Sequence, residues 1–368
     1  MKDMMLGKLP DALLLNNGER VADADGWRLR RQEIIDGALK LCYGGMPPEP
    51  EHFELQTLYE GGPGRTGTYK IITGSAQKQL SIYLKIYRPK TDGKTPVVLD
   101  GDGCWHYLSS DIIDEVLSHG YSLAVFDRTE LVRDLWHDPK PRDSALYEVY
   151  PDIGSGTIAG WAWGMQRCVD ALTRIEWIDA ENIAVTGHSR GGKTAMLAGV
   201  TDERIKFIAP NGSGAGGAGC WRYITLEPEE WQQADNPTRS ERVDDMFFNF
   251  PNWLGKDMEP FGKNEGALPF DQHFFKVLAA PRWFLQTEGF ADVWANSKGT
   301  YLTYLAAKEV YRLLGVEERI LSHFREGGHA HRLSDFRLLL NVMDHAIKGA
   351  PLSDEFDQDP FPEMKQYL

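Results

Sequence analysis

Residues 183–191 read Ile183-Ala184-Val185-Thr186-Gly187-His188-Ser189-Arg190-Gly191. The first four residues form a short apolar run, which is typical of a buried strand, and a helix-like segment begins near Lys193. Between them the sequence fits the pattern G-x-S-x-G, in which a serine occupies a tight strand-to-helix turn. The turn is crowded, so the positions that flank the serine must lack side chains, and both are glycine. We therefore predict that Ser189 is a catalytic nucleophile; the alternative is a chance match within a loop.

Apolar runs of this kind recur along the chain and alternate with helix-like segments. The runs lie at 96–101, 122–127, 182–187, 205–210, 282–287 and 319–324. The helix-like segments lie at 112–118, 159–175, 194–200, 299–314 and 333–348. Upstream, residues 53–88 alternate apolar and polar positions, which indicates antiparallel strands with one solvated face. Together with the serine motif, this order predicts the α/β-hydrolase fold, in which a mostly parallel central sheet carries helices on both faces.

The same pattern divides the chain into three parts. We predict an N-terminal helical arm at residues 1–50, the α/β-hydrolase domain at residues 51–350 and a C-terminal tail at residues 351–368. Two stretches, 128–155 and about 211–272, interrupt the alternation of strands and helices. Long stretches of this kind in a compact domain are usually lids or binding loops, and we expect the second to be a lid insertion.

The composition excludes several classes of protein. The formal net charge of -14 over 368 residues, without clustered Lys and Arg, argues against nucleic acids and anionic membranes as partners. No apolar stretch approaches the length of a membrane span. The four cysteines show neither CxxC pairs nor zinc-site spacing, so no metal and no cofactor is expected. No signal peptide is recognisable, which predicts a cytoplasmic protein, or a secreted one if a leader was removed. The oligomeric state is not indicated.

A serine nucleophile needs a base, which in this fold follows the last strand of the sheet. The run Gly327-Gly328-His329-Ala330-His331 occupies that place. Its glycines allow the loop to turn sharply, so that the next side chain reaches the carboxyl edge of the sheet. We predict that His329 is the base, with His331 as the alternative.

The acid of a catalytic triad should follow the strand that ends at Thr287. Two carboxylates stand there, Glu288 and Asp292. The small residues before Asp292 allow a turn toward the histidine loop, so we predict that Asp292 orients the imidazole, with Glu288 as the alternative. For the oxyanion, the backbone N–H of Arg190 is the expected first donor, and residues 100–103 are expected to supply the second.

Several of these segments resemble the glucuronoyl esterases, carbohydrate esterase family fifteen. The resemblance rests on the block around Ser189 with Arg190 and Lys193, on residues 161–167, and most specifically on residues 210–222. It implies that Ser189 is the nucleophile and that Arg190 stabilises the oxyanion. It also implies that Lys193 contacts sugar hydroxyls.

The resemblance implies further substrate contacts. Trp294 looks like an aromatic residue that faces the sugar. Trp221 and Arg222 belong to the most specific block and are assigned to substrate binding; alternatively, Trp221 fills the core and Arg222 pairs with an acid of the lid. One position departs from the family pattern, because Gly212 stands where many members carry a catalytic Glu. The acid role therefore falls to Asp292.

The sequence thus predicts a serine carboxylic-ester hydrolase that acts on a carbohydrate ester through a Ser-His-Asp acyl-enzyme mechanism. The expected partner is a small-molecule or oligosaccharide ester with uronate or acetyl as its acyl part. Two alternatives within the same class are an acetyl esterase acting on xylan or oligosaccharides and a general small-molecule esterase. An alternative from another class is a catalytically silent homologue that binds carbohydrate.

Overall fold

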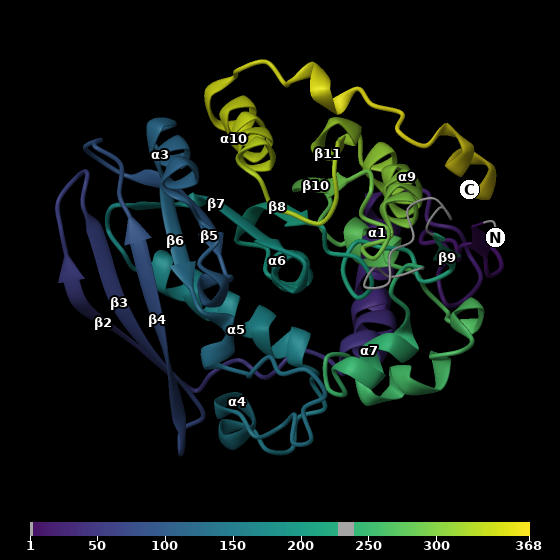
Figure 1. Cartoon of the computed structure of the whole chain (residues 1–368), viewed down its shortest axis with the longest axis horizontal. Coiled ribbons are helices and arrows are strands. Elements are labelled where there is room, and N and C mark those ends of the chain that lie inside the picture. Colours follow the sequence, from purple (N-terminus) through teal and green to yellow (C-terminus); the bar gives the residue numbers. More distant parts are fainter. Residues whose placement is uncertain (1–2, 227–238) are drawn as a thin grey trace.

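A nine-stranded sheet forms the centre of the computed structural model (Figure 1). The structure describes residues 3–226 and 239–368. The strands of this sheet are β2 (His52–Glu60), β3 (Thr66–Gly74), β4 (Gln79–Tyr87), β5 (Thr95–Asp100), β6 (Ser122–Phe126), β7 (Ile178–His188), β8 (Ile205–Asn211), β10 (Trp283–Gly289) and β11 (Ile320–Arg325). In space they follow the order β11-β10-β8-β7-β5-β6-β4-β3-β2.

The sheet is parallel in its central part and antiparallel at one edge. The strands from β11 to β6 pair in parallel with their neighbours. The strands β6, β4, β3 and β2 pair antiparallel. The six predicted apolar runs correspond to β5, β6, β7, β8, β10 and β11, and the alternating stretch at 53–88 corresponds to β2, β3 and β4. The predicted mostly parallel sheet is therefore confirmed.

Helices cover both faces of the sheet, as predicted. The longer helices are α3 (Ser110–Ser118), α5 (Thr157–Leu172), α6 (Arg190–Thr201), α9 (Ser297–Leu313) and α10 (Leu333–Lys348). Figure 1 shows α3 and α10 together above the sheet, with α5 and α6 below it. Each side has its own hydrophobic core: residues of α3 and α10 pack with one set of strand side chains, and residues of α5, α6 and α9 pack with the other. Within the described ranges, no helix is both long and apolar enough to cross a membrane.

Shorter elements surround this body. The helices α1 (Ala24–Ile34) and α2 (Lys40–Tyr43) are joined by a π-helical turn. A small antiparallel pair joins β1 (Met4–Met5) to β9 (Tyr223–Ile224). The remaining helices are α4 (Ala145–Val149), α7 (Val243–Asn249) and α8 (His273–Val277). Residues 227–238 of the predicted insertion lie outside the described residues, and the proposed domain boundaries stay a prediction.

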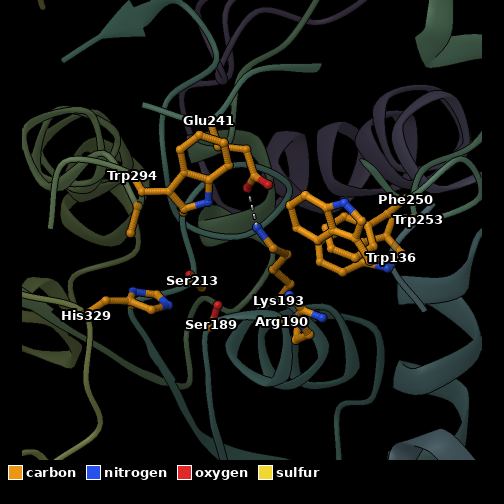
Figure 2. Close-up of a pocket in the computed structure, with 13 residues that line it drawn as sticks. Trp136, Ser189, Arg190, Lys193, Ser213, Glu241, Phe250, Trp253, Trp294 and His329 are labelled. Atoms are coloured by element: carbon orange, nitrogen blue, oxygen red, sulfur yellow. Dashed lines mark hydrogen bonds and ion pairs between the residues drawn. The ribbon is translucent and has the colours of Figure 1, made fainter. Parts of the chain in front are cut away.

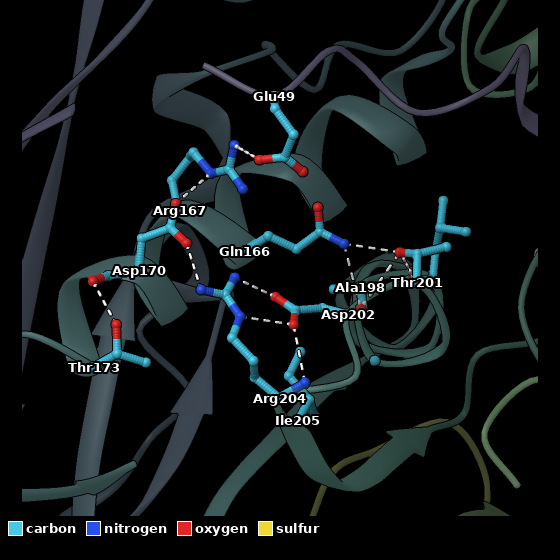
Figure 3. Close-up of polar contacts among 12 residues, drawn as sticks. Glu49, Gln166, Arg167, Asp170, Thr173, Ala198, Thr201, Asp202, Arg204 and Ile205 are labelled. Atoms are coloured by element: carbon cyan, nitrogen blue, oxygen red, sulfur yellow. Dashed lines mark hydrogen bonds and ion pairs between the residues drawn. The ribbon is translucent and has the colours of Figure 1, made fainter. Parts of the chain in front are cut away.

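A charged network stabilises the end of α6 that lies away from Ser189 (Figure 3). The buried Arg167 of α5 lies 2.8 Å from Asp170 and 3.2 Å from Glu49. Asp170 also pairs with Arg204 at 2.7 Å, and Arg204 pairs with Asp202 at 2.6 Å. These contacts tie α5 to the turn between α6 and β8, about 18 Å along α6 from its first residue.

Candidate active site

Ser189 stands at the junction of β7 and α6, on the predicted turn. Its backbone has φ 55° and ψ -117°, a left-handed conformation that is strained for a residue with a side chain. A Cβ atom at Gly187 would lie 2.5 Å from the carbonyl oxygen of Gly191, and one at Gly191 would overlap the carboxylate of Asp102. The turn therefore requires both glycines, because a side chain at Gly187 would push the strand from the helix and one at Gly191 would displace Asp102.

His329 and Asp292 form a hydrogen-bonded pair close to Ser189. The loop after β11 turns at Gly327, which has φ 101°. His329 Nδ1 lies 2.5 Å from Asp292 Oδ2, and the other carboxylate oxygen accepts the N–H of Ala295 at 3.1 Å. Ser189 and His329 line the same pocket, and Figure 2 shows the imidazole and the hydroxyl directed toward each other. This arrangement fits a serine that is activated by a histidine, with a buried carboxylate orienting the imidazole.

The two alternative triad residues lie in other surroundings. His331 Nδ1 lies 3.1 Å from the hydroxyl of Tyr107, and its ring stacks on Phe336. Burial lowers the pKa of His331 well below its ordinary value. Glu288 is 1% exposed, and neither of its carboxyl oxygens has a hydrogen-bond partner among the described residues. Burial and the nearby Asp292 raise the pKa of Glu288 well above its ordinary value. Among the described residues, neither His331 nor Glu288 forms a histidine–carboxylate pair such as the one between His329 and Asp292.

His188 places a second imidazole next to the proposed base. Its ring centroid lies 4.4 Å from that of His329. Its Nδ1 lies 2.6 Å from Oδ1 of Asn211, so Nδ1 carries the proton and donates to the amide oxygen. Burial, followed by the nearby His329, lowers the pKa of His188 to about 4. His188 is therefore neutral at pH 7 and places no positive charge beside the base.

Ser189 lies in an open pocket with a cavity volume of about 120 Å³. Its wall includes a buried ion pair, because Lys193 Nζ lies 3.0 Å from Glu241 Oε2. Lys193 also donates to the carbonyl oxygen of Ala215. Four aromatic residues complete the wall (Figure 2): Trp136, Phe250, Trp253 and Trp294. Charged groups beside aromatic faces are able to bind the hydroxyls and the apolar face of a sugar ring.

The sequence predicted part of this pocket and missed part of it. Arg190, Lys193 and Trp294 were predicted, and the structure brings them to the wall with Ser189 and His329. The sequence reasoning missed a carboxylate and three aromatic residues of the same wall: Glu241, Trp136, Phe250 and Trp253. The aromatic-rich stretch 246–253 was an available signal for two of them. Nothing separated Glu241 from the many other acids of the chain.

Trp221 and Arg222 do not line this pocket, which corrects their assignment to substrate binding. Both are 2% exposed. Arg222 Nη1 lies 3.1 Å from Asp271 Oδ2 and donates to the carbonyl oxygen of Phe270 at 2.6 Å. The N–H of Trp221 donates to Asp271 at 2.9 Å. The backbone turns both side chains inward, so that Trp221 fills the core and Arg222 pairs with Asp271, an acid of the predicted lid insertion.

Residues 100–103 also lie away from the pocket wall. The carboxylate of Asp102 instead accepts the N–H of His188 at 2.8 Å and pairs with Arg128. Burial raises the pKa of Asp100 to about 8, and the neighbouring Asp102 adds to the effect. This turn therefore contacts the backbone just before Ser189 and does not line the pocket. The geometry gives no support to the prediction that residues 100–103 supply the second oxyanion donor. Among residues 3–226 and 239–368, no group of three or more His, Cys, Asp or Glu side chains is arranged to hold a metal ion.

Comparisons with known proteins agree with this geometry. The family model described as fungal glucuronyl esterase matches residues 71–315. The 4-O-methyl-glucuronoyl methylesterase 1 of Wolfiporia cocos is 28% identical over 331 residues, which cover 88% of this chain and 76% of the fungal protein.

Solved structures give the same result. A glucuronoyl esterase from Caldicellulosiruptor kristjansonii superposes with a TM-score of 0.84 at 29% identity, covering 96% of this chain and 94% of the other. The catalytic domain of a glucuronoyl esterase from Hypocrea jecorina shares the fold with a TM-score of 0.79 at 22% identity, covering 100% of this chain and 97% of the other. This chain belongs to the glucuronyl esterase family and is a serine-type carboxylic-ester hydrolase with the α/β-hydrolase fold.

Proposed function

We propose that this chain hydrolyses a glucuronoyl ester carried by a small sugar or an oligosaccharide. The observation that carries the proposal is the Lys193–Glu241 ion pair, which faces the same pocket as Ser189 and His329. Burying two opposite charges at a pocket wall costs desolvation energy, which a polar ligand able to bind both groups offsets. The names of the relatives, 4-O-methyl-glucuronoyl methylesterases, support uronate rather than acetate as the acyl part.

The proposed reaction is a two-step acyl transfer. Ser189 Oγ attacks the ester carbonyl carbon while His329 accepts the hydroxyl proton. The resulting tetrahedral intermediate collapses, the bond to the alcohol oxygen breaks, and His329 returns its proton to that oxygen. Water then attacks the acyl-serine with the same imidazole as base, which releases the acid and restores Ser189. Asp292 holds the imidazole by its Nδ1 throughout and stabilises the imidazolium.

The acyl side of the pocket provides specificity. Lys193 and Glu241 are placed to bind ring hydroxyls as donor and acceptor, and Trp294 offers an indole face to the sugar ring. Arg190 lies next to the nucleophile, where its backbone N–H and its guanidinium are available to the oxyanion.

A panel of esters tests the proposal. The purified enzyme is assayed on the methyl ester of 4-O-methyl-glucuronate, on an acetylated xylo-oligosaccharide and on 4-nitrophenyl acetate. We expect the uronate ester to have the highest kcat/KM, and Ser189→Ala to abolish its hydrolysis. Preference for the acetylated sugar identifies an acetyl esterase instead. No hydrolysis, together with failure of a fluorophosphonate to label Ser189, identifies a carbohydrate-binding homologue.

Matched pairs of variants test the triad. We expect His329→Ala and Asp292→Asn to lower kcat by about 10³-fold or more, while His331→Ala and Glu288→Gln retain most of it. Loss of activity in His331→Ala but not in His329→Ala overturns the assignment of the base. Full activity of Asp292→Asn excludes it as the acid.

A further inference from the structure

A buried chain of ion pairs connects the Arg190 side chain to the backbone of the nucleophile turn. Arg190 Nη1 lies 3.0 Å from Asp134 Oδ1, and Asp134 Oδ2 lies 3.2 Å from Nη2 of Arg128. Arg128 Nη1 pairs with Oδ1 of Asp102. The other carboxylate oxygen of Asp102, Oδ2, accepts the backbone N–H of His188 at 2.8 Å. This series of contacts therefore begins at the pocket wall with Arg190 and ends at His188, one residue before the nucleophile.

The central residues of this ion-pair series, Arg128, Asp102 and Asp134, are buried and closely packed. The side chains of Arg128 and Asp102 are fully buried, and that of Asp134 is 6% exposed. The Arg128 guanidinium also packs over the rings of Trp105 and Trp161, at 4.4 and 4.9 Å from their centroids. A carboxylate fixed by a buried, doubly paired arginine has little freedom to move.

The Arg190 guanidinium depends on this anchor. It lies over the rings of Phe250 and Trp253, 4.8 and 4.9 Å from their centroids, and its side chain is 26% exposed. Within the described part of the chain, Asp134 is its only hydrogen-bonding partner. Stacking on aromatic faces is less directional than a charge-assisted hydrogen bond, so the contact with Asp134 is the one that fixes the position of the guanidinium.

We propose that Asp134 is a positioning residue for the esterase reaction: it holds the Arg190 guanidinium where negative charge develops on the ester oxygen. This inference rests on the proposed function of the Ser189 site. Groups that stabilise an oxyanion are effective when they are fixed before the reaction, because no energy is then spent in orienting them. Arg128 and Asp102 join this anchor to the turn that carries Ser189, so that nucleophile and guanidinium keep one geometry.

The direct test is the Asp134→Asn variant, compared with Asp138→Asn. Asp138 belongs to the same loop, is 6% exposed and pairs with Arg133 through two contacts of 2.7 Å, without reaching Arg190 or the turn. We expect Asp134→Asn to lower kcat by about 10- to 100-fold with KM changed by less than about threefold. Asp138→Asn should stay within about twofold of the wild type. Equal losses in the two variants, or a loss confined to KM, overturn the proposal.

A double-mutant cycle shows whether Asp134 acts through Arg190. In the Arg190→Ala background, adding Asp134→Asn should lower kcat by less than about twofold further, since the group it positions is gone. If the loss of kcat in the double variant equals the product of the losses in the two single variants, the residues act independently and the proposal is contradicted. If thermal unfolding shows that Asp134→Asn does not fold, the same cycle is run with Asp134→Glu, which keeps the charge and displaces the carboxylate.

A readout without a sugar separates this inference from the substrate proposal. In the reaction with a fluorophosphonate, Ser189 Oγ bonds to phosphorus, the P–F bond breaks and fluoride leaves, and His329 accepts the serine proton and passes it to water. The phosphoryl oxygen occupies the oxyanion position. We expect Asp134→Asn to slow this labelling by the same factor as kcat. If the wild-type enzyme is labelled by the fluorophosphonate but hydrolyses no sugar ester, the substrate proposal alone is refuted. If Asp134→Asn is labelled at the wild-type rate, the positioning role alone is refuted.

Discussion

Two buried arginines, Arg128 and Arg167, occupy similar surroundings at opposite ends of α6. Both are at most 1% exposed, and each pairs with two carboxylates. Each also packs over tryptophan: Arg128 lies over the rings of Trp105 and Trp161, and Arg167 lies over Trp163 at 4.9 Å. Both arginines are therefore held by the same kinds of contact, namely two carboxylates and a tryptophan face.

The two networks differ in where they lead. From Arg128 the contacts pass through the buried Asp134 to Arg190 at the pocket wall. From Arg167 they pass through Asp170 to Arg204, whose side chain is 41% exposed (Figure 3). A buried ion pair thus says little about function by itself, and the group at the far end of the network decides what the pair does.

The largest expected difference concerns stability. Arg128→Met leaves the fully buried Asp102 without its cation, so we expect the free energy of unfolding to fall by about 3–5 kcal/mol. Arg167→Met leaves Asp170 paired with Arg204, so we expect a loss of only about 1 kcal/mol. Urea denaturation of both variants measures the difference. If both variants shift the urea midpoint equally at the same m value, burial of the partner carboxylate does not determine how much each arginine contributes to stability.

The next largest difference concerns the reaction rate. We expect Arg190→Ala to lower kcat by about 10²–10³-fold, because the group proposed to stabilise the oxyanion is lost. Arg204→Ala removes the corresponding terminal arginine of the other network and should leave kcat within about twofold of the wild type. Steady-state kinetics on the uronate ester measure both effects, and a comparable loss in Arg204→Ala would contradict the separation of roles.

A smaller difference concerns acid stability. Above pH 6.5 His188 is neutral in both the folded and the unfolded chain, but its pKa of about 4 in the folded state means that unfolding takes up a proton at lower pH. The stability contributed by His188 is therefore fully present above pH 6.5 and is lost as the pH falls through 4. We expect His188→Gln to flatten the fall of the melting temperature between pH 6.5 and 4, while Arg204→Ala keeps the slope of the wild type. Identical slopes for all three proteins would rule out this titration as a source of acid lability.

The smallest expected effect lies at the outer end of the second network. The side chain of Glu49 is 87% exposed, so its pair with Arg167 is screened by solvent. We expect Glu49→Ala to change the free energy of unfolding by less than about 0.5 kcal/mol and kcat by less than about twofold. Urea denaturation and steady-state kinetics check this, and a loss above 1 kcal/mol would show that the exposed end of this network is as important as its buried part.

Local patterns were sufficient for the parts of the fold that repeat at short range. The apolar runs that became β5, β7 and β8 are buried on both faces, and such strands are recognisable from composition alone. The turn at Ser189 was recognisable because its crowding admits only glycine at Gly187 and Gly191. The proposed base was located by the same reasoning, since glycines before His329 mark a sharp loop.

Other site residues had no local signature. Glu241 and Asp134 stand in stretches without periodicity, and their importance comes from contacts with Lys193 and Arg190, 48 and 56 positions away in the sequence. Trp221 and Arg222 were misassigned for the opposite reason. Their block is distinctive in sequence, but a motif does not state which way its side chains face, and the backbone turns these two inward.

The sequence by itself determined that a serine stands on a strand-to-helix turn and that the residues expected for a triad follow in the usual order, because those features depend on the chain's own geometry over a few residues. Only the tertiary structure decided which charges and rings meet. Trp161 and Trp163 lie two residues apart on α5, so they point to different sides of the helix. One packs against Arg128 at the nucleophile and the other against Arg167 at the far end. Trp163 lies four residues before Arg167 on the same helix, so local helix geometry brings these two together, whereas only the tertiary structure brings Trp161 to Arg128.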